Sequence, residues 1–109
     1  MSLATKTSQP LPKGSPALEM SQAGELHKQV SDWMLDQDQQ TISREFKFKN
    51  FYETIEFVNA VAWIANQQDH HPDLEVSYNR CRVIFTTHSV GGLSENDFIC
   101  AARVNTLFE

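Results

Sequence analysis

Three of the four histidines in this chain lie in two places where a regular element is expected to end. His70 and His71 are adjacent and directly precede Pro72, whereas His88 follows an apolar segment and precedes a Gly-Gly pair. Imidazole has an unperturbed pKa of about 6.5, so two or three such rings around one pocket can act as general acid and general base without a metal ion. This pattern predicts proton-transfer chemistry, provided that the fold brings the two places together.

The adjacent pair sets a geometric condition for such a site. Neighbouring side chains on a regular element point in different directions, so His70 and His71 can face one ligand only if the backbone bends near them. Pro72 is the expected cause of this bend, because proline disfavours helical geometry at the residue before it. His88 is expected where a strand gives way to the Gly91-Gly92 loop, and loops at element ends often carry functional residues.

Asp97 has two interpretations that are compatible with each other. Ser94 and Asp97 have the spacing of a capping box, and an acidic residue in the first turn is favoured by the helix dipole. A helix N-terminus that follows a Gly-Gly loop is also suited to bind an anion or another polar ligand. Asp97 is therefore a candidate both for capping a helix and for a role in the site.

Other kinds of chemistry find little support in the sequence. Three histidines could bind zinc, but the chain has neither an HxxxH nor an HExxH pattern, so no metal site is expected. A nucleophile elbow and a Gly-rich phosphate loop are also missing. Cys81 and Cys100 form neither a CxxC pair nor a disulfide framework, which indicates reduced thiols without a catalytic role.

The composition limits the class of protein. The chain has 109 residues, 40% of them hydrophobic, which suits one domain with a core of modest size. Its net charge of −5 argues against non-specific binding to nucleic acid or to an anionic membrane surface. No apolar run approaches ~18 residues, so no membrane span is expected, and the N-terminus lacks the apolar segment of a secretory signal. We therefore expect a cytoplasmic protein.

The chain divides into two parts by composition. Residues 1–19 contain three of the four prolines and few side chains that could pack, so they are expected to form a flexible leader. Residues 20–109 are expected to form a single domain. Its apolar spacing predicts helices from Ser21 to about Trp33, from Asn50 to about Gln68, and from Ser94 onward.

Strands are expected between these helices. Alternation of apolar and polar residues predicts strands over 41–48, 75–77 and 82–88, with a turn at 78–80. In the last of these strands, Val83, Phe85 and Thr87 are expected to share one face. The polar run at 36–40 predicts a turn between the first of these strands and one before it. Strand pairs joined by short turns favour an α+β fold, with a four-stranded antiparallel sheet and three helices packed on one face.

The helix expected from Asn50 carries two apolar stripes. One contains Phe51, Ile55, Val58, Ala62 and Ala65, and the other contains Phe57, Val61 and Ile64. Two stripes are more apolar surface than one sheet face needs. Either the helix is deeply buried, or it makes an additional helix contact in another subunit.

A set of spaced motifs resembles the pterin-4a-carbinolamine dehydratase family. These motifs are Asp69-His70-His71-Pro72, then Tyr78, then Thr87-His88, and then Gly92-Leu93-Ser94-Glu95-x-Asp97. Trp33 and the segment 46–51 are also similar to that family, and the resemblance covers about residues 20–108. It implies the same α+β fold, association into homodimers or homotetramers, and no cofactor.

The resemblance also implies an activity and its residues. The reaction is loss of water from 4a-hydroxytetrahydrobiopterin to give quinonoid dihydropterin, which regenerates the cofactor of aromatic amino-acid hydroxylases. The implied catalytic residues are His70, His71 and His88. The implied substrate-binding residues are Asp69, Pro72, Thr86, Thr87, Ser89 and Asp97. His70 and His88 are expected to be the acid/base pair, with His71 orienting the substrate.

One residue departs from the family pattern. Many members carry Glu four residues before the first histidine of the pair, where this chain has Asn66. If Asn66 and His70 lie on one helix, residue 66 contacts the ring, and a carboxylate there would raise the histidine pKa. Two other roles stay open: a protein-interaction module, such as the transcriptional dimerisation cofactors of this family, and an altered role in pterin metabolism.

Overall fold

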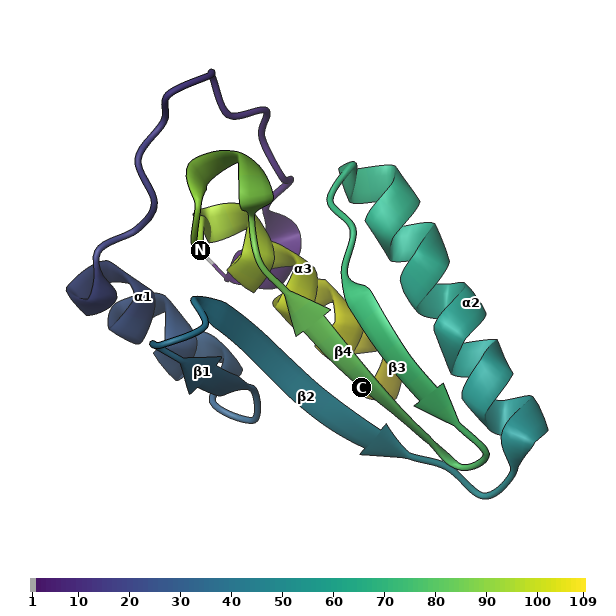
Figure 1. Ribbon diagram of the computed structural model, residues 1–109. Coiled ribbons are helices and arrows are strands. Elements are labelled where there is room, and N and C mark those ends of the chain that lie inside the picture. Colours follow the sequence, from purple (N-terminus) through teal and green to yellow (C-terminus); the bar gives the residue numbers. More distant parts are fainter. Residues whose placement is uncertain (1) are drawn as a thin grey trace.

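The structure, a computed structural model, describes residues 2–109 and has the expected α+β fold (Figure 1). Four antiparallel strands form one sheet in the order β1-β2-β4-β3. The strands are β1 (Met34–Asp36), β2 (Thr41–Lys47), β3 (Asp73–Ser77) and β4 (Arg80–Phe85). The α-helices are α1 (Met20–His27), α2 (Phe51–Gln68) and α3 (Glu95–Asn105). They pack on one face of the sheet, as predicted.

The strand that leads to His88 has the two faces predicted from its alternation. Val83 and Phe85 of β4 are fully buried, and Thr87 beyond it is buried on the same face. Arg82, directly before Val83 in sequence, lies on the other face, where its guanidinium contacts Glu75 of β3 at 3.2 Å. Because β4 is a central strand, flanked by β2 and β3, its end is held firmly.

Helix α2 begins at the predicted cap and ends for a reason that the sequence analysis missed. The Asn50 side chain accepts a hydrogen bond from the Glu53 N–H at 2.9 Å. At the other end Asp69 adopts the left-handed conformation, with φ 50° and ψ 43°. The His70 N–H then bonds the Ala65 carbonyl at 3.1 Å, closing a Schellman-type cap. The bend therefore lies at Asp69, not at Pro72.

The two apolar stripes of α2 have different surroundings. Phe57, Val61 and Ile64 are buried against the sheet and α3. By contrast, Phe51 of the first stripe is 50% exposed. Outside both stripes, Tyr52 is 75% exposed and Trp63 is 65% exposed on the outer side of the helix. The interpretation of α2 as a deeply buried helix is therefore wrong, since one side of it is open in the isolated chain.

The N-terminal region is packed more closely than predicted. Leu3, in a short 3₁₀-helix (Leu3–Thr5), is 2% exposed and belongs to the hydrophobic core. Further polar contacts tie residues 6–9 to α2 and α3. Part of the segment expected as a leader, residues 2–9, thus contacts the packed body in this structure; Met1 lies outside the described residues.

Smaller differences concern α1. The helix begins at Met20 after the N-cap Glu19, rather than at Ser21, and a capping box with Gln22 closes its first turn. It ends at His27, and residues 28–30 continue as a 3₁₀-helix. No helix within residues 2–109 is long and apolar enough to cross a membrane.

Candidate active site

A buried carboxylate lies at the centre of the candidate site. Asp97, in the first turn of α3, is fully buried. Its Oδ1 lies 2.5 Å from His70 Nε2, while its Oδ2 accepts hydrogen bonds from Thr87 Oγ1 at 2.8 Å and from the Ser94 N–H at 2.9 Å. A buried carboxylate is costly unless such bonds satisfy it. Asp97 therefore holds together the end of α2, the end of β4 and the start of α3.

His70 has one fixed orientation in this arrangement. Its ring stacks on Phe85 with 5.9 Å between the centroids and 12° between the planes, and its side chain is 11% exposed. An ionised carboxylate can only accept hydrogen bonds, so His70 Nε2 must carry the hydrogen that it shares with Asp97. In the neutral ring, Nδ1 is then an acceptor that can take a proton.

The hydroxyl network behind Asp97 has a defined direction. Thr87 donates its only hydroxyl hydrogen to Asp97, so Ser94 Oγ is the donor in its 2.7 Å contact with Thr87 Oγ1. The backbone of Thr87 is also occupied, because its N–H bonds the Gly92 carbonyl at 2.8 Å. Thr87 therefore uses its hydroxyl hydrogen to bind Asp97 and its backbone N–H to close the loop that carries His88.

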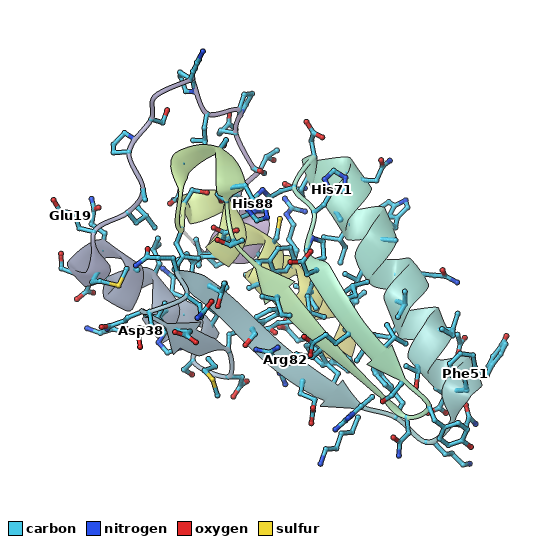
Figure 2. All side chains as sticks on the ribbon, in the orientation of Figure 1. Glu19, Asp38, Phe51, His71, Arg82 and His88 are labelled. Carbon is cyan, nitrogen blue, oxygen red and sulfur yellow. The ribbon has the colours of Figure 1, made fainter. Side chains whose placement is uncertain are left out.

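His71 and His88 are exposed, in contrast to His70. Figure 2 shows His71 beside the end of α2 and His88 on the turn that follows β4, at the same end of the molecule. His88 begins a 3₁₀-turn (His88–Val90), which ends at Gly91 with φ 70°. Since positive φ favours glycine, Gly91 suits this position. The fold therefore brings the two histidine-bearing places to one end of the sheet.

A hollow of about 520 Å³ opens beside His88. Thr86, Gln40, Asp73 and Gly92 contribute to its walls, whereas neither His70 nor His71 is among the lining residues. Its size falls within the range of small-molecule sites. The Thr86 hydroxyl donates to the Gln40 carbonyl at 2.8 Å, so it helps to shape the wall.

The remaining predicted site residues have diverse positions. Asp69 forms the left-handed cap of α2, and its side chain is exposed, as is that of Ser89. Pro72 lies in the short link between His71 and β3. Asn66 is exposed on the last turns of α2, whereas His70 follows the cap and has left the helix. The two therefore do not share a helical face, so the expectation that they form an i,i+4 pair on one helix is wrong.

Sequence reasoning missed two contributors to the site. Phe85 supplies the surface on which the His70 ring stacks, and Ser94 orients the Thr87 hydroxyl. The alternation along the strand placed Phe85 and Thr87 on one face, which is the signal that could have linked Phe85 to the site. Ser94 was assigned only as a helix cap.

Comparison with known proteins gives the same result as the motifs. The profile described as Pterin 4 alpha carbinolamine dehydratase matches residues 16–107. The chain belongs to this dehydratase family. A relative from Nitrosospira multiformis, provisionally named a pterin-4-alpha-carbinolamine dehydratase, is 51% identical over 98% of this chain and 93% of its own. A relative of the same name from Legionella pneumophila (strain Corby) is 55% identical over 84% of this chain and 81% of its own.

Solved structures related to this dehydratase family share the fold. A crystal structure of a transcriptional coactivator/pterin dehydratase from Brucella melitensis superposes with a TM-score of 0.78 at 33% identity, covering 84% of this chain and 97% of that one. A pterin dehydratase-like protein identified as a RuBisCO assembly factor in the α-carboxysome superposes with a TM-score of 0.60 at 21% identity, covering 70% of this chain and 88% of that one. The second likeness concerns the fold alone.

Besides the histidines, the thiols of Cys81 and Cys100 could in principle take part in chemistry. Burial raises the pKa of the Cys81 thiol to about 11. Burial and the neighbouring Asp97 carboxylate raise the pKa of Cys100 to about 12. Neither cysteine therefore supplies a thiolate near neutral pH. Across residues 2–109, no three or more His, Cys, Asp or Glu side chains are grouped so that they could hold a metal ion.

Proposed function

We propose that this chain catalyses the dehydration of 4a-hydroxytetrahydropterin to quinonoid dihydropterin. The observation that carries the proposal is the bond between His70 Nε2 and the buried Asp97, because it leaves Nδ1 as the acceptor in the neutral ring. Membership of the pterin-4-alpha-carbinolamine dehydratase family supports the same reaction. The substrate class is a reduced pterin that carries a hydroxyl at C4a.

The reaction requires two proton transfers and no change of oxidation state. One proton is given to the 4a-hydroxyl, which leaves as water when its bond to C4a breaks. One proton is removed from N5, whose electron pair then forms the double bond to C4a. Because the protons gained and lost balance, an acid and a base at one site suffice, and imidazoles near neutral pH supply both.

We assign the base to His70 and the acid to His88. A proton accepted at His70 Nδ1 creates an imidazolium that the Asp97 carboxylate stabilises through Nε2. His88 is exposed beside the hollow, where it can exchange protons with solvent before each turnover. His71, which follows the cap of α2, would orient the substrate.

The other predicted residues would bind the flat pterin edge or support the site. Thr87 acts through Asp97, because its hydroxyl and its backbone N–H are both occupied. Asp69, Pro72, Thr86 and Ser89 flank the histidines, and exposed groups of this set would contact the substrate. In this proposal the enzyme needs no cofactor, and it serves tetrahydrobiopterin recycling for aromatic amino-acid hydroxylases in the cytoplasm.

The test is a stopped-flow measurement of freshly generated 4a-hydroxytetrahydropterin by ultraviolet absorbance. The slow reaction without enzyme is subtracted from every trace. Wild type is compared with His70→Ala and His88→Ala, each confirmed folded by circular dichroism. His27→Gln is the matched control, because His27 lies in α1 and bonds the Trp33 carbonyl.

We expect wild type and His27→Gln to accelerate the reaction, and each site variant to lose ~10²-fold or more of that acceleration. If folded wild type gives only the uncatalysed rate, the proposed activity is wrong. The alternative of a protein-interaction module would then be tested by direct binding to candidate partners.

We also propose that copies of the chain associate through the outer side of α2. The exposed Tyr52 and Trp63 side chains lie on that helix, and large apolar groups in the open often mark a contact with another molecule. Light scattering after size exclusion should show a dimer or tetramer for wild type. Trp63→Glu should dissociate it; an unchanged mass for Trp63→Glu would exclude this surface.

A further inference from the structure

A segment far from the histidines in sequence bridges the two helix ends that form the site. We call residues 6–18 the N-terminal strap. The Ser8 N–H donates to Gln68 Oε1 at 2.8 Å, at the last residue of α2. Gln9 pairs with Asn96 of α3 in both directions: its N–H donates to Oδ1 at 2.9 Å, and its carbonyl accepts from Nδ2 at 2.8 Å.

The strap is anchored on both sides of this bridge. Lys6 forms an ion pair with Glu95 at 3.0 Å, and its carbonyl accepts two hydrogen bonds from the Arg103 guanidinium. At the other end the Leu18 N–H donates to the Leu93 carbonyl at 2.8 Å. In Figure 1 the strap leaves the start of α3 and runs around the outside of the His88 turn to α1. The N-terminal strap thus connects elements that lie far apart in the sequence.

The N-terminal strap links the same two helix ends, of α2 and α3, as the contact between His70 and Asp97. Gln68 lies two residues before His70, and Asn96 directly precedes Asp97. The bond between His70 Nε2 and Asp97 Oδ1 joins these helix ends once, and the strap joins them a second time. The spacing between the two ends is therefore set by two links, only one of which involves the reacting histidine.

The two amides have their bonding partners in the strap. Gln68 is 6% exposed and Asn96 is 7% exposed. Within residues 2–109, every side-chain hydrogen bond of these two residues goes to Ser8 or Gln9. A buried polar group that loses its partner carries a large desolvation cost. Without the strap, the ends of α2 and α3 would have to move or admit water.

We propose that the N-terminal strap positions the general base, with Gln68 and Asn96 as its positioning residues. The strap fixes the separation between the end of α2 and the start of α3, and so keeps His70 Nε2 on Asp97. The kinetic part of this inference rests on the proposed dehydratase activity. The structural part, a His70 ring held in one orientation by residues 8 and 9, does not.

The kinetic test uses three single variants of the full chain. Asn96→Ala and Gln68→Ala remove the two attachment points. Lys6→Ala is the matched control, because it breaks a partly exposed ion pair of the same strap and leaves both amides bonded. We expect Asn96→Ala to lower kcat by ~10-fold, with a smaller change in KM and a shifted pH–rate profile. Gln68→Ala should act in the same direction, and Lys6→Ala should stay within ~2-fold of wild type.

The second readout does not depend on turnover. In nitrogen-15 NMR of histidine-labelled protein, the hydrogen on His70 Nε2 should give a downfield, slowly exchanging signal in wild type and in Lys6→Ala. This signal should shift or broaden in Asn96→Ala. If wild type proves inactive but the signal behaves in this way, the proposed function fails and the positioning role stands.

A deletion of residues 2–9 gives the strongest contrast. We expect it to lower kcat more than either single variant, and we expect a synthetic peptide of residues 2–9 to restore part of the loss. If Asn96→Ala and Gln68→Ala lower thermal stability but keep the wild-type kcat, pH profile and His70 signal, the strap is only a structural cap and the proposal is overturned. This conclusion holds even if the deletion variant fails to fold.

Discussion

The two ends of the sheet are held together by different forces. At one end, which we call the polar end, His70, Thr87 and Ser94 surround the buried Asp97 with directional hydrogen bonds. At the other, which we call the aromatic end, four phenylalanine rings pack with centroids 4.6–6.5 Å apart. These rings belong to Phe46, Phe48, Phe57 and Phe108.

The difference separates positioning from stability. Hydrogen bonds at the polar end have narrow geometry, so they fix the orientation of the His70 ring. Apolar contacts at the aromatic end are not directional, so they contribute free energy of folding and tolerate small movements. Substitutions at the polar end should therefore change the rate, and substitutions at the aromatic end should change stability.

The largest expected effect is on stability, at the aromatic end. Phe57→Ala should lower the free energy of unfolding by ~3–5 kcal/mol, because Phe57 is 5% exposed and contacts the other three rings. Urea unfolding measures the loss. Tyr78→Ala is the control, with a change below ~0.5 kcal/mol, because Tyr78 is 63% exposed and lies outside α2. A reduced kcat per folded molecule in Phe57→Ala would contradict the separation of roles.

The next effect is on the rate, at the polar end. Asp97→Asn should lower kcat by ~10²-fold or more, because an amide that donates to His70 Nε2 moves the ring hydrogen to Nδ1 and removes the acceptor. Stopped-flow dehydration at several pH values measures this change. Thermal unfolding is the control, since the amide keeps the volume of the carboxylate. A kcat within ~3-fold of wild type would show that the tautomer of His70 does not matter.

The two cysteines report on the two ends at alkaline pH. The pKa of each thiol is raised from ~8.5 in the unfolded chain to about 11 for Cys81 and about 12 for Cys100. Above pH ~9 the unfolded chain loses protons that the folded chain keeps, so stability should fall as the pH rises toward 11–12. Below pH ~8 the thiols should have no effect.

Urea unfolding of single variants between pH 8 and 11 tests this dependence. Cys100→Ala should remove more of the alkaline loss than Cys81→Ala, because the Asp97 carboxylate adds to the effect of burial only at the polar end. Both variants must be compared with wild type at each pH, so that the cost of the smaller side chain cancels. Equal slopes in all three proteins would refute the assignment.

The smallest expected effect concerns Asn66. A carboxylate at this exposed position should raise the pKa of the site histidines only slightly, since solvent screens it and His70 has left the helix. Asn66→Glu should therefore move the acidic limb of the pH–rate profile upward by less than ~0.5 unit. Asn66→Gln is the neutral control. A larger shift would mean that residue 66 approaches the substrate.

Much of the fold was predictable because it depends on local repetition. The alternation in β4 placed Val83 and Phe85 on one face, which is the buried one, and the Asn50–Glu53 spacing located the start of α2. The end of α2 was located correctly but for the wrong reason. An aspartate in the left-handed conformation leaves no periodic signal, whereas a proline is conspicuous, so Pro72 was given the role that Asp69 has.

The contacts of the candidate site were harder to predict from the sequence than the fold. The Ser94–Asp97 spacing indicated a cap, but nothing local shows that the same carboxylate also binds His70 and Thr87. The strap was missed for a related reason: Ser8 meets Gln68, and Gln9 meets Asn96, across 60 and 87 positions of sequence. Single polar contacts between residues so far apart leave no recognisable pattern in the sequence. The prolines of residues 1–19 favoured the prediction that this segment is flexible.

Asp97 closes the first turn of α3 through the Ser94 N–H and at the same time holds His70. A molecule in which this turn has frayed has therefore also lost the contact that orients the His70 ring, the base in the proposed reaction. Because one carboxylate has both tasks, copies with a frayed turn should have none of the proposed activity. In a purified preparation, specific activity would then measure the fraction of molecules that are correctly folded, whatever the protein concentration.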